Sequence, residues 1–183
     1  MAQVTKPVTK YSYREYECFP NDGIRHEIVD GEHFMSPAPA TKHQKVSRKL
    51  HFQLYAQIEL KQLGEVYNAP TDVELAKHDI VQPDIVVVLS EQLAIITPKK
   101  IHGVPALVIE ILSESNPRYD QVLKFEMYQR NGVPEYWIVD PIAETVHQFV
   151  WVDGRYVDAG THHETITAAT LVGVTVNLVE AWS

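Results

Sequence analysis

Apolar residues follow two different periodicities along this chain. Two short runs, Asp84–Leu89 and Ala106–Leu112, are apolar at almost every position and rich in β-branched residues, which predicts strands buried on both faces. A longer segment, Lys42–Leu63, has apolar residues at every fourth position instead. This spacing predicts an amphipathic helix with one buried stripe: Val46, Leu50, Leu54 and Ile58.

Turn and capping signals divide the rest of the chain. Asp30-Gly31 and Asp153-Gly154 are typical of the tight turns of β-hairpins. Thr41 with Gln44 has capping-box spacing at the start of the long helix, and Gly64 is suited to end it. The other expected elements are the helices Tyr13–Cys18 and Tyr119–Arg130 and the strands Ile24–Val29, Glu32–Met35, Glu65–Ala69, Asp72–Ala76, Glu135–Asp140, Thr145–Val152, Arg155–Ala159 and Val174–Leu178.

This order of elements predicts a mixed α/β (α+β) fold. With 183 residues, 45% of them hydrophobic, the chain is long enough for a single domain over 1–183, with a loose tail at 1–10. No apolar run approaches the roughly 20 residues that cross a bilayer. The N-terminus lacks the apolar segment of a secretory signal, and one cysteine, Cys18, excludes an intramolecular disulfide. We therefore expect a cytoplasmic protein in which Cys18 is a buried structural thiol.

The overall charge argues mildly against nucleic acid as a partner. The net charge is −8, whereas proteins that bind nucleic acid usually show an overall or local basic excess. A metal site requires acids, however, and electrostatic steering depends on the local field. The candidate basic positions form no dense tract: Lys42, Lys45, Arg48 and Lys49 on the long helix, Lys99, Lys100 and Arg118.

Asp84 and Glu110 are carboxylates inside apolar runs, where an uncompensated charge costs several kcal/mol. If the two runs are antiparallel neighbours, both side chains reach one end of the sheet from strands about 4.8 Å apart. A hard divalent cation is the simplest partner that they could share. The structural alternative makes Asp84 a strand-start cap and Glu110 a member of a buried ion pair.

Lys124, Glu27 and His43 are further candidates. Lys124 lies on the flank of the apolar face of its helix, from which an ammonium could orient a water or offset charge on a phosphate. The alternative is a surface salt bridge to Asp120, four residues earlier. Glu27 is either a third acid or part of a solvated hairpin face. His43 is either a phosphate contact or a surface residue of the first helical turn.

Other kinds of site lack their sequence signals. The histidines, including His162-His163, show neither HExxH nor paired Cys/His spacing, so a zinc site is not expected. The sequence contains no GxGxxG, P-loop or GxSxG motif. Ser113 and Ser115 have no surrounding motif that would make either a nucleophile.

Several of these residues belong to an ordered set of motifs that resembles a known family. The motifs are, in order, Glu27–Glu32, Pro37, Pro39, His43, Pro83-Asp84, Glu110–Ser113, Lys124 and Gly132–Pro141. Over roughly residues 10–160 the chain resembles the Uma-type putative restriction endonucleases, a family of the PD-(D/E)xK nuclease superfamily.

The resemblance implies a restriction-endonuclease-like fold, with a mixed central sheet flanked by helices. It also implies a divalent metal, usually Mg²⁺ with Mn²⁺ as a substitute, held by Asp84 and Glu110. Lys124 would be the catalytic lysine and Glu27 a supporting acid. The chain departs from the strict E-x-K motif at Leu112, where the motif places lysine. The family is similar in supplying its lysine from the following helix, which fits Lys124.

The resulting hypothesis is a cytoplasmic, Mg²⁺-dependent endonuclease acting on nucleic acid, with DNA as the expected substrate. A homodimer is expected from the resemblance and from the apolar C-terminal strands. One alternative is a catalytically silent nucleic-acid-binding or regulatory module that retains the nuclease fold, which the acidic surface favours. Another is an inert structural domain in which Asp84, Glu110 and Lys124 point to different places.

Overall fold

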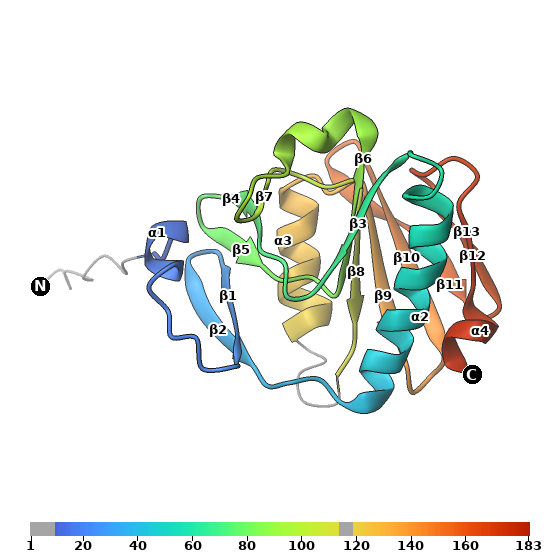
Figure 1. Ribbon diagram of the computed structural model, residues 1–183, viewed down its shortest axis with the longest axis horizontal. Helices are drawn as coiled ribbons and strands as arrows, with labels where there is room; N and C mark the ends of the chain where they lie inside the picture. The colour runs from blue at the N-terminus through green and yellow to red at the C-terminus, as the bar shows by residue number, and fades with distance from the viewer. Residues whose placement is uncertain (1–9, 114–118) are drawn as a thin grey trace, which may run out of the picture.

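A six-stranded mixed sheet lies at the centre of the computed structural model, which describes residues 10–113 and 119–183, with only the backbone for 119–121 (Figure 1). The strand order is β11-β10-β9-β8-β6-β3. β8 and β9 are parallel, and the other neighbours are antiparallel. The strands are β3 (Gly64–Asn68), β6 (Ile85–Leu89), β8 (Leu107–Ile111), β9 (Glu135–Asp140), β10 (Thr145–Val152) and β11 (Arg155–His162). The predicted mixed central sheet is present, and both apolar runs form interior strands of it.

Two smaller sheets accompany the central one. The first has the order β2-β1-β5-β4-β7, and the second pairs β12 with β13. The strands of the first are β1 (Arg25–Val29), β2 (Glu32–Ser36), β4 (Val73–Ala76), β5 (Asp79–Val81) and β7 (Ile101–His102). Those of the second are β12 (Thr165–Thr167) and β13 (Thr175–Asn177), followed by α4 (Leu178–Trp182). The Asp30-Gly31 and Asp153-Gly154 turns have positive φ at both residues, as the hairpin prediction requires.

The central sheet is covered on both faces. α2 (Thr41–Ile58) buries the predicted stripe of Val46, Leu50, Leu54 and Ile58 against odd-numbered strand residues such as Ile85 and Ile109. The opposite face, which carries the even-numbered Val86 and Val108, packs against α3 (Phe125–Arg130) and the five-stranded sheet. Because strand side chains alternate between faces, Asp84 and Glu110 belong to the α3 face.

The predicted helix Tyr119–Arg130 consists of two helix types, one after the other. Its first part, Tyr119–Lys124, is a π-helix, and α3 follows from Phe125. Lys124 is the last residue of this π-helix. π-helical turns are wider than α-helical turns and are frequent at functional sites. Asn131 caps α3 and Gly132 follows with a φ of +71°, a conformation that glycine favours after a helix.

Several local predictions were wrong. Ala40, not Thr41, is the N-cap of α2, and no side chain caps this helix end. α2 ends at Ile58 instead of Leu63, and the left-handed residue after it is Gln62 instead of Gly64. Cys18 is exposed, because the short helix α1 (Tyr13–Tyr16) ends before it. The sequence reasoning did not predict β5, β7, β12 or α4, each of which has at most five residues.

Some predictions cannot be compared with the structure. The proposed loose tail is almost entirely outside the described residues, as is the side chain of Asp120, the suggested surface partner of Lys124. A short 3₁₀-helix, η1 (Ser90–Ile95), follows β6. Among the residues that the structure describes, no helix is both long and apolar enough to cross a bilayer.

Gly64 is required for close strand packing, not for helix termination. A Cβ atom at this position would lie 2.2 Å from the Val88 carbonyl oxygen and 2.9 Å from the Leu89 Cα. We expect Gly64→Ala to lower the free energy of unfolding by about 3 kcal/mol, because β3 must move away from β6. Gly23→Ala is the control, since open space surrounds Gly23 and only its φ of +79° opposes a side chain, at about 1 kcal/mol. Equal losses in urea denaturation would contradict this explanation.

Candidate active site

Asp84 and Glu110 lie opposite each other on neighbouring strands. The antiparallel register of β6 and β8 pairs Ile85 with Ile109, and one step further it brings Asp84 opposite Glu110. Residues in this relation share a sheet face, with Cβ atoms about 5 Å apart. Both carboxylates are almost completely buried, with 3% and 2% of their surface exposed. The antiparallel arrangement that the sequence analysis considered is therefore present.

Asp84 accepts three hydrogen bonds. Arg25 of β1 donates from Nη2 to Oδ1 at 3.0 Å, and the Ile111 amide donates to Oδ2 at 2.8 Å. His43 Nε2 lies 3.0 Å from Oδ2. An ionised carboxylate can only accept, so His43 carries its hydrogen on Nε2. This leaves Nδ1, which is buried and has no hydrogen-bond partner in the described parts of the chain.

The environment keeps Asp84 ionised. Desolvation by itself would raise the pKa of this carboxyl group. The His43 hydrogen bond, the positive charge of Arg25 and the Ile111 amide outweigh that effect and lower the pKa to about 2. Asp84 therefore offers a permanent negative charge in a buried place.

Lys124 joins the other two acids. Its Nζ donates to Glu27 Oε1 at 2.9 Å and to Glu110 Oε1 at 2.8 Å, and only 1% of the lysine is exposed. Tyr128, one helical turn later, donates to the same Glu110 oxygen at 2.6 Å. Burial, followed by the charge of Glu110, raises the pKa of Tyr128, so its hydroxyl remains a donor. Lys124 is thus a buried bridge between two carboxylates.

Glu27 is also fixed by a backbone hydrogen bond. Its Oε1 also accepts the backbone N–H of Gln82 at 2.9 Å, and 1% of the residue is exposed. Glu27 and Arg25 are two residues apart in β1, so both side chains extend from one face of the hairpin toward the central sheet. The solvated hairpin face that was the alternative for Glu27 is wrong.

One pocket of about 320 Å³ is lined by Arg25, Glu27, Asp84, Glu110 and Lys124. The rest of its wall comes from the segment between β2 and α2, from the first turn of α2 and from the end of β8: Ser36, Pro37, Ala38, Pro39, Ala40, His43, Ile111 and Ser113. Pro37 and Pro39, which belong to the motif set described above, therefore form part of the pocket wall. All five predicted site residues, Glu27, His43, Asp84, Glu110 and Lys124, meet here.

The sequence analysis missed Arg25, Gln82 and Tyr128. The period of two along β1 was the available signal for Arg25, because it places this residue on the same face as Glu27. Tyr128 follows Lys124 by four residues, a helical spacing that was present in the sequence. No sequence signal connects the Gln82 amide with Glu27, because this contact depends on how β1 packs.

Removing the Lys124 ammonium should destabilise the protein. We expect Lys124→Met to lower the free energy of unfolding by about 3–5 kcal/mol, because two buried carboxylates lose their shared counter-charge. A second substitution, Glu27→Gln, should restore part of that loss. The exposed Lys61 provides the control, and Lys61→Met should change stability by less than about 0.5 kcal/mol. Equal stability of the two methionine variants in urea denaturation would refute the structural role of Lys124.

Asp84 should make folding stability depend on pH below neutrality. Its pKa is lowered to about 2 from the ordinary 3.8, so its contribution is complete above about pH 4 and is lost as the pH falls toward 2. Arg25→Gln should destabilise the protein most above pH 4, and the gap to the wild type should close as Asp84 becomes protonated. Denaturation curves from pH 2 to pH 7 measure this gap, with Arg14→Gln as the exposed control. A gap that stays constant with pH would show that Arg25 does not act through Asp84.

The chain matches a family model and resembles a solved structure. The family model Uma2, described as "Putative restriction endonuclease", matches residues 13–178. The crystal structure of a putative nuclease belonging to DUF820 from Anabaena variabilis superposes with a TM-score of 0.77 and 15% sequence identity, covering 94% of this chain and 97% of that chain. This likeness confirms the predicted fold class. No curated protein matches the chain. Because the family model spans nearly the whole sequence, the protein belongs to the Uma2 family of restriction-endonuclease-like nucleases, as its motifs predicted.

Proposed function

We propose that the protein is a Mg²⁺-dependent endonuclease that hydrolyses phosphodiester bonds in DNA. The observation that carries this proposal is the pair of opposed carboxylates, Asp84 and Glu110, in one pocket with the Lys124 ammonium. Family membership supports a nuclease. Magnesium, DNA and the roles of individual residues are the parts that we add.

The donor set suits a hard divalent cation. The described pocket residues include three carboxylates and two cations, Arg25 and Lys124. With His43 left out of the count, their net charge is −1, which a divalent ion would offset. No group of three or more His, Cys, Asp or Glu side chains within the described ranges is arranged to hold a metal by itself. Mg²⁺ is commonly bound by one or two carboxylates, with water and phosphate oxygens as further ligands. Asp84 and Glu110 would supply those carboxylates. The bound ion would polarise the phosphate and lower the pKa of a water.

The chain's own residues supply positioning and positive charge. Lys124, fixed between Glu27 and Glu110, would orient the attacking water or stabilise the negative charge that builds up on the phosphate. Tyr128 keeps Glu110 in place. Arg25 lines the pocket with 19% of its side chain exposed, so its guanidinium could bind a non-bridging phosphate oxygen. His43 would orient Asp84 and could contact the substrate.

One observation favours the rival function of a catalytically silent binding or regulatory module. Both oxygens of Asp84 already accept hydrogen bonds, so a cation must share them or displace Arg25. Titration calorimetry with Mn²⁺ distinguishes the two functions. Binding that is lost in Asp84→Asn supports the nuclease. Absence of binding, with and without an oligonucleotide, supports the silent module.

Homodimerisation and a cytoplasmic location stay predictions. Sedimentation velocity would measure the first directly. The proposed catalytic site is built from residues of one chain, so its geometry does not require a second copy.

Cleavage should require Glu110. In 5 mM Mg²⁺ we expect the wild type to cut DNA and Glu110→Gln to be slower by at least about 100-fold, because the isosteric amide removes the charge that would hold the cation. Glu126→Gln is the matched control, since Glu126 is exposed on α3 and should be dispensable. Rates on labelled single-stranded and duplex DNA, with circular dichroism to confirm folding, provide the measurement. Full Mg²⁺-dependent activity of Glu110→Gln would overturn the proposal.

A further inference from the structure

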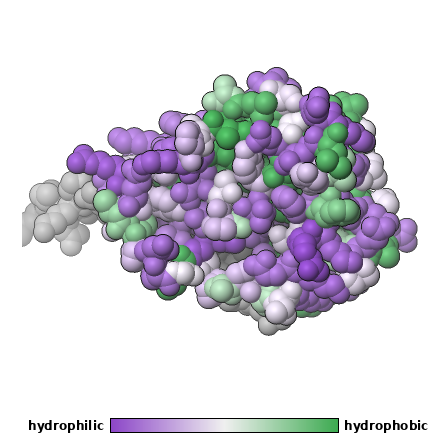
Figure 2. Space-filling model, viewed as in Figure 1, coloured by the Kyte–Doolittle hydropathy of each residue, from purple (hydrophilic) through white to green (hydrophobic). Residues whose placement is uncertain are grey.

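The long helix α2 is positively charged on an otherwise acidic protein. Between Thr41 and Ile58 it contains no Asp or Glu, but it carries Lys42, Lys45, Arg48 and Lys49. The whole chain has a net charge of −8. The first half of α2 also lies under strongly hydrophilic surface in Figure 2. This helix therefore carries four cations within eight residues and no acid of its own.

Two of these cations share one exposed stripe with two aromatic rings. Lys45, Arg48, Phe52 and Tyr55 follow one another at intervals of three or four residues, opposite the buried stripe of α2. All four are exposed, and Phe52 has 69% of its surface in solvent. An aromatic ring this exposed adds nothing to the core, so folding does not explain it. We call these four residues the α2 stripe.

The cations of this helix are free to bind an anion. Among the described residues, Lys42, Lys45 and Arg48 form no ion pair. Lys49 Nζ donates only to the hydroxyl of Ser183 at 3.2 Å. A hollow of about 450 Å³ is lined by Arg48, Lys49, Phe52 and Gln53 of α2 and by Glu180 of α4. Two cationic residues and one aromatic residue of α2 thus border the same hollow.

The α2 stripe lies on the outer side of the helix whose first turn helps to line the proposed catalytic pocket. The first turn of α2 contains His43, which binds Asp84, and Ala40 at its N-cap lines the pocket. At 1.5 Å per residue, the distance along the helix from Lys45 to Tyr55 is about 15 Å. A polymer bound in the pocket could therefore continue along the outer side of α2.

We infer that the α2 stripe binds a single-stranded segment of the nucleic acid whose phosphodiester is held in the pocket. The substrate class rests on the proposed function. Lys45 and Arg48 would contact phosphates, and the exposed faces of Phe52 and Tyr55 would stack against unpaired bases. A duplex hides its base faces, so only a single strand uses both halves of the stripe. A second copy of the chain is a poorer occupant, because α2 carries four cations and no acid, so pairing two copies through this helix would bring like charges together without an acid of α2 to offset them.

Binding to short DNA in EDTA tests this inference without cleavage. The probe is a fluorescein-labelled DNA of about 20 nucleotides, as single strand or as duplex, followed by anisotropy. Lys45→Gln/Arg48→Gln should weaken single-strand binding roughly tenfold at physiological salt and reduce the slope of log K against log salt by about 1.4. Phe52→Ala should weaken single-strand binding about tenfold and leave duplex binding and the salt slope unchanged.

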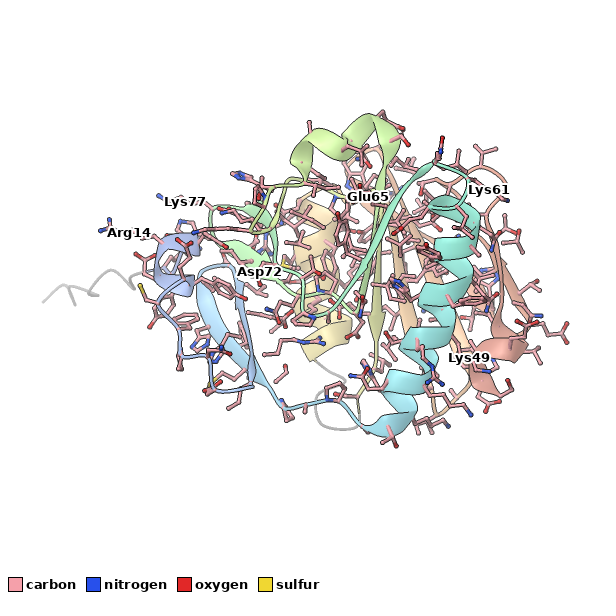
Figure 3. The ribbon with its side chains drawn as sticks, viewed as in Figure 1. Arg14, Lys49, Lys61, Glu65, Asp72 and Lys77 are labelled. Atoms are coloured by element: carbon pink, nitrogen blue, oxygen red, sulfur yellow. The ribbon has the colours of Figure 1, made fainter. Side chains whose placement is uncertain are left out.

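A control with the same charge change separates the stripe from overall charge. Arg14 and Lys77 are exposed and lie at the far end of the molecule from α2, whereas Lys49 projects from α2 itself (Figure 3). Arg14→Gln/Lys77→Gln should bind single-stranded DNA within about twofold of the wild type. An equal loss in this control would overturn the inference, as would unchanged binding in Lys45→Gln/Arg48→Gln. A Phe52→Ala variant that binds DNA normally but converts a dimer into a monomer would assign the face to a second copy and overturn it too.

The result is distinguishable from that of the proposed function. Binding along the α2 stripe without Mg²⁺-dependent cleavage would overturn the nuclease proposal alone. Cleavage by a protein whose stripe variants bind like the wild type would overturn the binding inference alone.

Discussion

The paired hydrogen bonds of the Lys124 ammonium to Glu27 and Glu110 are the contacts on which this site depends. They join β1 of the five-stranded sheet, β8 of the central sheet and the end of the π-helix. A buried charge is tolerated only when it is paired, so Lys124 depends on the two acids and each acid depends on Lys124 for its counter-charge. Asp84 then completes the cluster from β6, with its own counter-charge from Arg25. The protein thereby holds three hydrogen-bonded acids in one small volume.

Burial of an acid by itself does not identify such a site. Glu135 is completely buried, but its oxygens accept hydrogen bonds from the neutral donors Trp137, Gln148 and Thr170. These contacts tie the segment after β12 to the central sheet, and Glu135 does not line the pocket that contains Asp84 and Glu110. The Gly132–Pro141 motif thus includes a structural acid, whereas Asp84 and Glu110 share a pocket with cations. The nature of the partners, together with the pocket, separates the two roles.

Local signals in the sequence predicted some structural features of this protein correctly and others wrongly. The hairpin turns were correct because Asp-Gly pairs adopt positive φ with little dependence on their surroundings. Gly64 was misinterpreted because its need to be glycine comes from the Val88 carbonyl across the sheet, not from the helix before it. The predictions that Thr41 caps α2 and that Cys18 is buried were wrong for a similar reason. Capping and burial depend on where the neighbouring segments of the chain lie. Elements of two to five residues, such as β7 and α4, gave no periodic signal long enough to detect.

The sequence by itself determined the central strands and the chemical character of the site. Short, β-branched runs that are apolar at almost every position are typical of buried strands, and acids inside them require a compensating partner, so Asp84 and Glu110 stood out without coordinates. The tertiary structure decided which partners they have. The β6–β8 register sets the two carboxylates opposite each other. Arg25 and Glu27 reach the cluster from β1, and the Gln82 amide, which follows β5, holds Glu27. Those contacts join residues up to 97 positions apart, and local sequence carries no information about such distant pairs.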